Sequence, residues 1–172
     1  MEKKRAIFLD KDGTLVDSSM YPEVPGHELL KEDILDGLRY AQEKGFALFI
    51  VSNQSWISKG KLTHEQAIRT FESVVAQLEE HGIKIADYTF CPHKSEDYCL
   101  CRKPRPGMIL DLAKRHNIDL ASSYMVGDFD EDIESGKNAG VKTILTLTNA
   151  QTHYINKPDF IIRNVNELRR IL

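Results

Sequence analysis

RAIFLDKDGTLVD, residues 5–17, is the stretch that decides the fold of this chain. The run from Ala6 to Leu9 is continuously apolar and is stopped by a turn signal, so it predicts a strand buried on both faces, as in a parallel sheet. Two carboxylates, Asp10 and Asp12, follow this strand. An Asp-Gly turn accounts for Asp12, but a charge at Asp10 beside a buried strand requires a partner. A partner for Asp10 is therefore expected at the ends of the other strands.

Strand-like and helix-like segments alternate along the rest of the chain. The predicted strands cover residues 6–10, 46–51, 86–90, 123–127, 142–147 and 159–162, and the predicted helices cover residues 33–44, 64–81, 106–116, 130–139 and 165–171. This alternation predicts an α/β fold with a mainly parallel sheet and helices on both faces. The length of 172 residues and the absence of a linker or repeat predict a single domain over residues 1–172.

Composition and charge exclude several classes of partner. The net charge of −3 and the isoelectric point near 6.1 give no general attraction to nucleic acid or to anionic lipid. No apolar run approaches the length of a membrane span. The polar start Met-Glu-Lys-Lys-Arg leads straight into the first strand, so we expect no signal peptide and a cytoplasmic protein. We expect a monomer that acts on a small molecule.

Polar clusters follow three of the predicted strands, at residues 10–12, 52–55 and 127–130. Ligands of open parallel sheets bind beyond the carboxyl ends of the strands, so these clusters predict one site. A carboxylate such as Asp10 can attack phosphorus and form an aspartyl-phosphate. Asp12, two residues on, points to the same side and can act as general acid and base.

Phosphoryl transfer also requires a hard cation and positioned donors. Asp10, Asp128 and the backbone carbonyl of Asp12 are candidate Mg²⁺ ligands, and Ser52 and Lys103 are candidate donors to the phosphoryl group. The chain lacks the GxxxxGK[ST] motif, which excludes a P-loop kinase.

These motifs, in their order along the chain, resemble the four motifs of the haloacid dehalogenase superfamily of phosphatases. They are Asp10-Lys11-Asp12-Gly13-Thr14, Ser52-Asn53, Lys103, and Gly127-Asp128 with Asp132. The resemblance covers roughly residues 6–147 and implies a Rossmann-like sheet. It implies that Asp10 is the nucleophile, that Asp12 is the general acid/base, and that Asp128 is a Mg²⁺ ligand. It further implies that Ser52 and Lys103 hold the phosphoryl group and that Asp132 is an orienting residue. The gaps between motifs are too short for a cap domain, so we expect a capless member.

A second motif, CPHKSEDYCLCRKPRPGM at residues 91–108, contains all three cysteines of the chain. Cys91, His93, Cys99 and Cys101 form the pattern C-x-H-x₅-C-x-C, which is typical of a closed, tetrahedral structural zinc site. We expect residues 91–103 to form a small zinc-binding loop that fixes where Arg102 and Lys103 point.

This loop narrows the resemblance to the phosphatases that include the heptose-bisphosphate phosphatases and the histidinol-phosphatase domains. Residues 52–55, 60–63, 102–108 and 123–128 are closer to the heptose enzymes, which implies removal of the 7-phosphate from D-glycero-D-manno-heptose 1,7-bisphosphate. The implied substrate contacts are Ser18, Ser19, Met20, Tyr21, Ser52, Asn53, Gln54, Ser55, Arg102 and Lys103. Arginine suits the second phosphate because its planar guanidinium binds oxygens in pairs.

Other interpretations stay open at this stage. Only five residues separate His93 from Cys99, which is closer to the histidinol-phosphatase pattern, so histidinol phosphate or another small phosphorylated metabolite is the alternative substrate. Trp56 replaces a glycine that is usual in both groups, and its ring either borders the substrate pocket or packs on Met20-Tyr21. A zinc-stabilised binding module without catalysis is the alternative of another class, and the intact catalytic motifs argue against it.

The remaining histidines have no ligand spacing, and we expect their side chains to be solvated. They are His27, His64, His81, His116 and His153.

Overall fold

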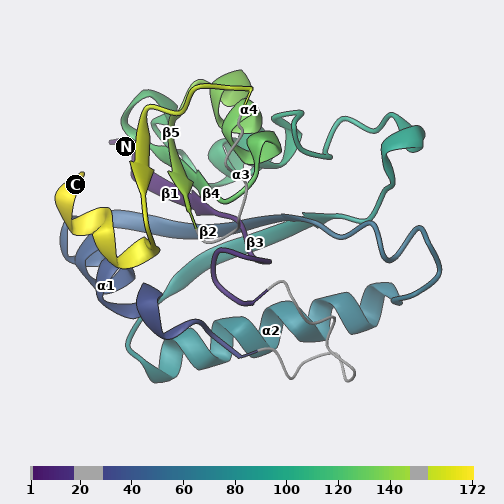
Figure 1. Ribbon diagram of the computed structural model, residues 1–172, viewed down its shortest axis with the longest axis horizontal. Coiled ribbons are helices and arrows are strands. Elements are labelled where there is room, and N and C mark those ends of the chain that lie inside the picture. Colours follow the sequence, from purple (N-terminus) through teal and green to yellow (C-terminus); the bar gives the residue numbers. More distant parts are fainter. Residues whose placement is uncertain (1, 18–28, 148–154) are drawn as a thin grey trace.

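The computed structural model describes residues 2–17, 29–147 and 155–172 (Figure 1). The centre of the fold is a six-stranded sheet in the order β3-β2-β1-β4-β5-β6, and every neighbouring pair of strands is parallel. The strands are β1 (Arg5–Leu9), β2 (Phe46–Asn53), β3 (Ile85–Cys91), β4 (Tyr124–Gly127), β5 (Lys142–Thr146) and β6 (Phe160–Ile162). The α/β class and the parallel sheet predicted from the sequence are confirmed.

Helices cover both faces of this sheet. The α-helices are α1 (Leu35–Glu43), α2 (His64–Glu80), α3 (Gly107–His116) and α4 (Asp130–Ala139), and the short 3₁₀ helices are η1 (Glu32–Ile34), η2 (Ser95–Asp97), η3 (Leu120–Ser122) and η4 (Val165–Arg170). Figure 1 shows α3 and α4 on one face and α1, α2 and η4 on the other. No described helix is long and apolar enough to cross a membrane.

Strand β1 illustrates why the core has two layers. Ile7 and Leu9 lie in the core cluster shared with α1, α2 and η4, whereas Ala6 and Phe8 lie in the cluster under α3 and α4. Successive side chains of a strand point to opposite faces, and all four are fully buried, which explains the continuously apolar run. The described residues between the four motifs add no second sheet, as is expected of a capless fold.

Helix boundaries differ from the predicted ones in two places. The segment predicted as one helix over residues 33–44 divides into η1 and α1, because Asp33 has non-helical backbone angles (φ −86°, ψ 28°). The C-terminal segment is the 3₁₀ helix η4 rather than an α-helix. Helix α2 begins at a complete capping box, in which Thr63 and Gln66 exchange side-chain and backbone hydrogen bonds.

The prediction of a solvated His116 is wrong. Its ring lies 4.9 Å from the ring of Phe49, centroid to centroid, and its Nε2 lies 2.7 Å from Asp87 Oδ2. His116 therefore connects the end of α3 to the edge strand β3. The local sequence could not indicate this contact, because its partners lie in distant segments. His64 and His81 are exposed, as expected, and His27 and His153 lie outside the described residues.

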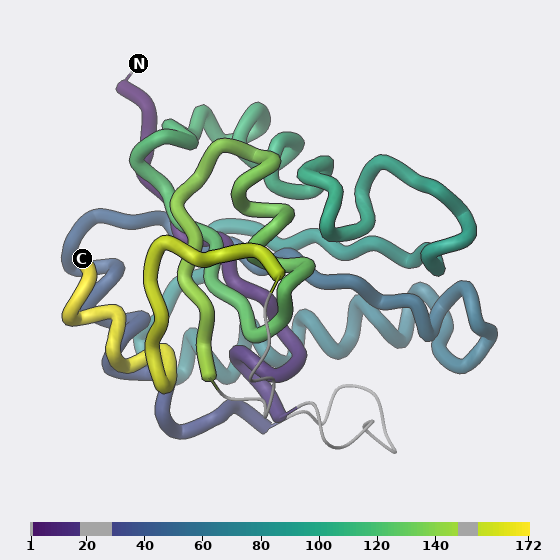
Figure 2. Tube along the Cα trace, turned by 45° about the horizontal axis from the view of Figure 1, so that its top comes forward, coloured from purple at the N-terminus to yellow at the C-terminus, as the bar shows by residue number. Residues whose placement is uncertain are grey.

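Two loops project from the same end of the molecule, as Figure 2 shows. One follows β2 and leads to α2, and the other is the loop of residues 91–103 after β3. The backbone N–H groups of Gln54 and Ser58 donate to the carbonyls of Cys91 and Pro92, at 2.7 Å and 3.2 Å. These bonds connect the segment after motif two to the start of the cysteine-rich loop.

Candidate active site

Residues from separate strand ends meet in one cavity at the carboxyl edge of the sheet. Strands β2, β1 and β4 are neighbours, so the residues that follow them lie side by side. The cavity has a volume of about 180 Å³ and is lined by Asp10, Asp12, Ser52, Asn53, Lys103, Phe129, Glu131 and Asp132. The structure therefore brings together the strand-end clusters that the sequence placed in three separate segments.

Lys103 is the buried cation of this cavity. Its Nζ lies 2.6 Å from Asp10 Oδ1 and 2.6 Å from Asp132 Oδ1, and it donates to the carbonyl of Val51 at 3.0 Å. Burial alone would lower the pKa of Lys103, but the Asp10 and Asp132 carboxylates reverse this and hold the pKa above its ordinary value. Lys103 is therefore a permanent positive charge in the site.

The backbone of Lys103 is fixed by the neighbouring strand end. The Asn53 side chain accepts a hydrogen bond from the Lys103 N–H at 3.0 Å and donates to the Lys103 carbonyl at 3.1 Å. Asn53, predicted as a substrate contact, thus positions the lysine through both halves of its amide.

Three buried carboxylates face this single lysine. The carboxylate oxygens of Asp10, Asp128 and Asp132 lie within 4.8 Å of one another. Burial raises the pKa of Asp10 well above its ordinary value, with Lys103 opposing the shift and the nearby carboxylates adding to it. Burial, with Asp132 next, raises the pKa of Asp128 to about 7. The group has more negative charge than Lys103 neutralises, and its oxygen donors fit a hard divalent cation such as Mg²⁺.

Gly13 allows the first motif to approach this group. Its φ of +90° lies in the left-handed region, and a Cβ there would lie 2.2 Å from Asp128 Oδ2. Any side chain at this position would displace the Asp128 carboxylate. The motif therefore requires glycine at this position for a steric reason, because the turn after β1 lies directly against the residue that follows β4.

Asp12 lies at the edge of the cavity with its side chain 41% exposed. Its Oδ1 lies 2.6 Å from Lys11 Nζ, and its Oδ2 accepts a hydrogen bond from Gln54 Nε2 at 2.7 Å. Ser52 Oγ is 3.5 Å from the same Oδ2 and accepts a hydrogen bond from Gln54 at 3.0 Å. Lys11, which sequence reasoning missed, is a buried cation beside Asp12; its position between the two motif aspartates was the available signal.

A second cavity of about 420 Å³ adjoins the first. Its lining residues are Ser95, Tyr98, Arg102, Lys103, Pro104, Arg105, Pro106, Glu131, Glu134 and Asn138. Arg102 Nη1 donates to the His93 carbonyl at 3.2 Å, and Arg105 Nη1 donates to the Cys99 carbonyl at 2.9 Å. The cysteine-rich loop therefore orients two guanidinium groups around this cavity.

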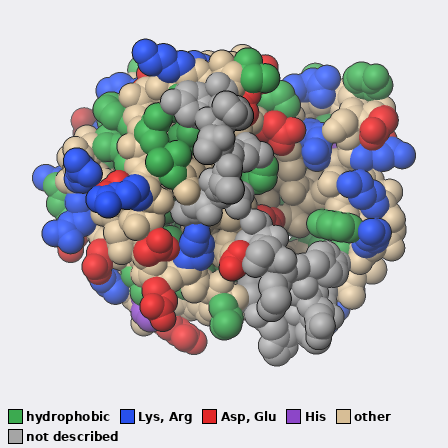
Figure 3. All heavy atoms as spheres, viewed as in Figure 1, with side chains coloured by type: hydrophobic (Ala, Val, Ile, Leu, Met, Phe, Trp, Pro, Cys, Tyr) green, Lys and Arg blue, Asp and Glu red, His purple; other side chains and the backbone are tan. Residues whose placement is uncertain are grey.

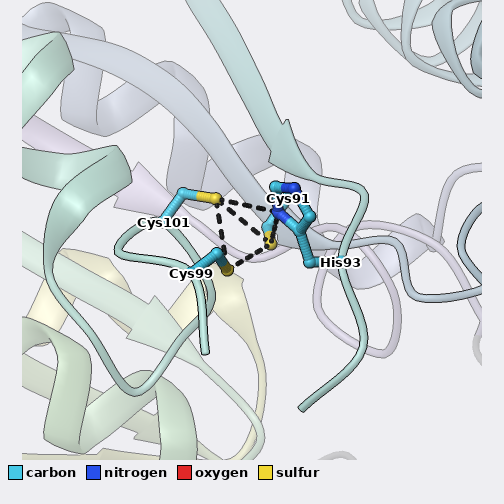
Figure 4. Close-up of side chains that lie close together, drawn as sticks. All are labelled: Cys91, His93, Cys99 and Cys101. Atoms are coloured by element: carbon cyan, nitrogen blue, oxygen red, sulfur yellow. Dashed lines mark hydrogen bonds between the residues drawn. The ribbon is translucent and has the colours of Figure 1, made fainter. Parts of the chain in front are cut away.

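The four predicted zinc ligands converge, as Figure 4 shows. The sulfur atoms of Cys91, Cys99 and Cys101 lie 3.3–3.5 Å apart, and His93 Nδ1 lies 3.4 Å from the sulfur atoms of Cys91 and Cys101. Ligands on a tetrahedral Zn²⁺ at ordinary bond lengths are separated by about 3.3–3.8 Å. The donor set and its spacing fit a zinc ion.

The backbone N–H of Arg102 donates to Cys99 Sγ at 3.3 Å. Burial raises the pKa of the Cys99 thiol, but this N–H and the two other thiols lower it more, to about 7. The bond also couples the ligand cluster directly to the backbone that leads into Lys103.

Trp56 is exposed beside two lysines. The ammonium groups of Lys61 and Lys59 lie 4.6 Å and 5.5 Å from the centre of its ring. Figure 3 shows Lys and Arg side chains along this edge of the molecule. Trp56 is not among the described residues that line the two cavities. Ser55 lies in the same turn, and the predicted contacts Ser18, Ser19, Met20 and Tyr21 lie outside the described residues.

Known proteins resemble this chain in sequence and in structure. A HAD-hydrolase-like family model matches residues 100–168. The D-glycero-beta-D-manno-heptose-1,7-bisphosphate 7-phosphatase of Yersinia pestis is 39% identical over 146 residues, which cover 80% of this chain and 77% of that protein. The enzyme of the same name from Escherichia coli K12 is 34% identical over 174 residues, which cover 95% and 91%. The chain belongs to this family of phosphatases.

The fold of the family also matches. A crystal structure of D,D-heptose 1,7-bisphosphate phosphatase from B. bronchiseptica, complexed with magnesium and phosphate, superposes with a TM-score of 0.84 at 25% identity, covering 97% of both chains. The corresponding enzyme from Burkholderia thailandensis has a TM-score of 0.70 at 20% identity, covering 95% of this chain and 94% of that one. The superfamily resemblance drawn from the four motifs is confirmed.

Proposed function

We propose that this protein is a Mg²⁺-dependent phosphomonoesterase that removes the 7-phosphate of D-glycero-D-manno-heptose 1,7-bisphosphate through an aspartyl-phosphate. The observation that carries the proposal is the buried group in which Lys103 joins Asp10 to Asp132, beside Asp12 and Asp128. The residues proposed as nucleophile, cation and acid/base line one cavity at the strand edge, which supports the proposal. The names of the relatives above support the substrate.

In the first step, an oxygen of Asp10 attacks phosphorus as the bond to the sugar oxygen breaks. Asp12 gives a proton to that leaving oxygen, and it then takes a proton from the water that hydrolyses the aspartyl-phosphate. Lys11 and Gln54 fix the position of the Asp12 carboxyl group at the cavity edge. Inorganic phosphate leaves and Asp10 is regenerated.

Two groups hold the phosphoryl oxygens in this proposal. Lys103 supplies a fixed positive charge, and Ser52 supplies a hydroxyl beside Asp12. Asp132 holds Lys103 Nζ 2.6 Å from its own carboxylate and so keeps the ammonium over Asp10. Asp132 is therefore a positioning residue in this scheme.

Asp10, Asp128 and the backbone carbonyl of Asp12 would hold the magnesium ion. When bound, Mg²⁺ neutralises charge on the carboxylates and on the transferring phosphoryl group. The raised pKa values of Asp10 and Asp128 support this assignment, because carboxyl groups buried so close together need a cation to stay ionised.

We further propose that Cys91, His93, Cys99 and Cys101 bind a structural zinc ion. The three thiols and one imidazole leave no open position for catalysis. Zinc would order the loop that carries Arg102 and Lys103, since the Cys99 sulfur accepts the Arg102 N–H.

Arg102 is the proposed contact for the 1-phosphate. It lines the second cavity, whereas Lys103 lies between that cavity and the catalytic one. A bisphosphate can therefore place one phosphate at Asp10 and the other at Arg102. Histidinol phosphate, favoured by the short zinc loop, is the alternative substrate; it has an ammonium group and no second phosphate.

The test compares phosphate release from heptose 1,7-bisphosphate and from histidinol phosphate, with and without Mg²⁺. Asp10→Asn should abolish turnover with an unchanged circular dichroism spectrum, while Asp111→Asn on exposed α3 serves as the control. Arg102→Ala should remove most of the preference for the bisphosphate, because a lost hydrogen bond to a charged group costs about 1.5–3 kcal/mol. A better turnover of histidinol phosphate by the wild type would refute the heptose assignment, and an active Asp10→Asn variant would refute the covalent mechanism.

A further inference from the structure

Two charged residues form the boundary between the two cavities. Lys103 and Glu131 line both the catalytic cavity and the cavity that contains Arg102. A substrate that spans both cavities must cross this boundary with the atoms that separate its two phosphates. Lys103 faces Asp10 and Asp132 and is assigned above to the reacting phosphoryl group, so Glu131 is the boundary side chain left for this middle part of the substrate.

The carboxylate of Glu131 can accept hydrogen bonds from a substrate at this boundary. Its side chain is exposed at the start of α4 and makes no hydrogen bond or ion pair with another described residue. Its carboxylate can only accept hydrogen bonds, so hydroxyl groups satisfy it, whereas a phosphate or carboxylate would be repelled. The charge therefore suits a neutral, hydroxyl-rich segment between two anionic ends.

Phe129 gives the catalytic cavity an apolar wall. It follows Asp128 directly, lines the cavity and stays 38% exposed, although it is an aromatic side chain. Its backbone is fixed, because the Phe129 N–H donates to Asp132 Oδ2 at 3.1 Å. Rings that border ligand pockets bury the apolar faces of their ligands, and the C–H face of a sugar is such a surface.

We propose that Phe129 and Glu131 determine specificity for the part of the substrate between the phosphates. Phe129 packs against the C–H face of the sugar beside the reacting phosphate, and Glu131 accepts hydrogen bonds from its hydroxyl groups. The pair favours a polyhydroxylated linker, disfavours an apolar linker, and rejects an anionic group next to the reacting phosphate. This inference deepens the proposed function and rests on it.

The test uses three phosphate esters that present different groups beside the reacting phosphate. They are heptose 1,7-bisphosphate, 1,7-heptanediol bisphosphate, which keeps both phosphates without hydroxyl groups, and 2-phosphoglycolate, which places a carboxylate beside the phosphate. The variants are Glu131→Ala, Glu131→Gln and Phe129→Ala. The matched controls are Glu80→Gln on exposed α2 and Leu110→Ala on α3, since neither side chain lines a described cavity.

Glu131→Ala should reduce the ratio of kcat/KM for the heptose over the heptanediol ester by about tenfold, the value of one hydrogen bond to a charged acceptor. Glu131→Gln keeps an acceptor oxygen, so it should retain part of this ratio and raise turnover of 2-phosphoglycolate by removing the repulsion. Phe129→Ala should raise KM for the heptose ester several-fold with kcat nearly unchanged, because packing that is equal in ground and transition states affects binding. Both controls should leave all three esters unchanged.

Unchanged substrate ratios in all three variants, in a wild type that prefers the heptose ester, would overturn this inference and leave the proposed function standing. A wild type that prefers histidinol phosphate would refute the proposed substrate, and the inference would fall with it. Thermal unfolding monitored for each variant separates a loss of contact from a loss of fold.

Discussion

Replacing Lys103 by Met tests how much the Lys103 ammonium stabilises the folded protein by neutralising buried carboxylates. Met has nearly the same length but no charge, so the variant leaves Asp10 and Asp132 buried without the ammonium that lies 2.6 Å from each. Removing one partner of a buried ion pair typically costs 3–5 kcal/mol, because the other partner is left uncompensated. We expect Lys103→Met to reduce the free energy of unfolding by about 3–5 kcal/mol at pH 8 without magnesium.

The loss of stability caused by Lys103→Met should become smaller as the pH falls. The pKa of Lys103 is raised in the folded state, so the lysine stays charged from pH 5 to 8 and does not itself titrate in this range. The folded-state pKa values of Asp10 and Asp128 are also raised, so these groups favour the protonated form as pH falls. A protonated carboxyl group needs no cation. The cost should therefore decrease toward pH 5, by up to about 1.4 kcal/mol per pH unit for each proton that only the variant takes up.

The assay is urea unfolding at pH 5, 6.5 and 8, followed by circular dichroism in magnesium-free buffer. Lys114→Met on exposed α3 is the matched control and should cost less than about 0.5 kcal/mol at every pH. A cost for Lys103→Met below 1 kcal/mol at pH 8, or one that is equal at all three pH values, would refute the reasoning.

Three shorter predictions follow from the same geometry. Magnesium affinity, measured by isothermal titration calorimetry, should rise up to about tenfold per pH unit below pH 7, because Asp128, with a pKa of about 7, must lose its proton to bind the ion; equal affinity at pH 6 and pH 8 would contradict this. Gly13→Ala should weaken magnesium binding and phosphatase activity together, because its Cβ would lie 2.2 Å from Asp128 Oδ2, whereas Gly82→Ala, with a similar positive φ and no atom within 4 Å of the Cβ, should cost only about 1–2 kcal/mol of stability from backbone strain; similar activity losses in both variants would argue against the steric explanation. Purified protein should contain about one equivalent of zinc, and Cys99→Ser should reduce it and lower both the melting temperature and activity; a zinc-free wild type with full activity would exclude a zinc-ordered loop.

The single-domain organisation, the monomeric state and the cytoplasmic location stay predictions.

Much of the fold is encoded locally. The apolar run of Ala6 to Leu9 predicted a strand buried on both faces, and its side chains divide between the two cores. The helix predicted over residues 64–81 is α2, and its start is fixed locally by the capping box of Thr63. Spacing predicted the four-ligand cluster, because its members lie within eleven residues and share one short loop. Such features depend on neighbours in sequence, so the sequence alone determined them.

Tertiary structure decided which distant groups become partners. Lys103 meets Asp10 across 93 positions of sequence, and this contact depends on the order of the strands and on the path of the loop after β3. The contact of Lys11 and Gln54 with Asp12, the packing of His116 against Phe49, and the boundary formed by Glu131 between two cavities also depend on the tertiary fold. Residue type and local periodicity indicate which groups need a partner, because an unpaired buried charge is costly. Only the packed fold fixes distances between segments, and therefore which partner each group obtains.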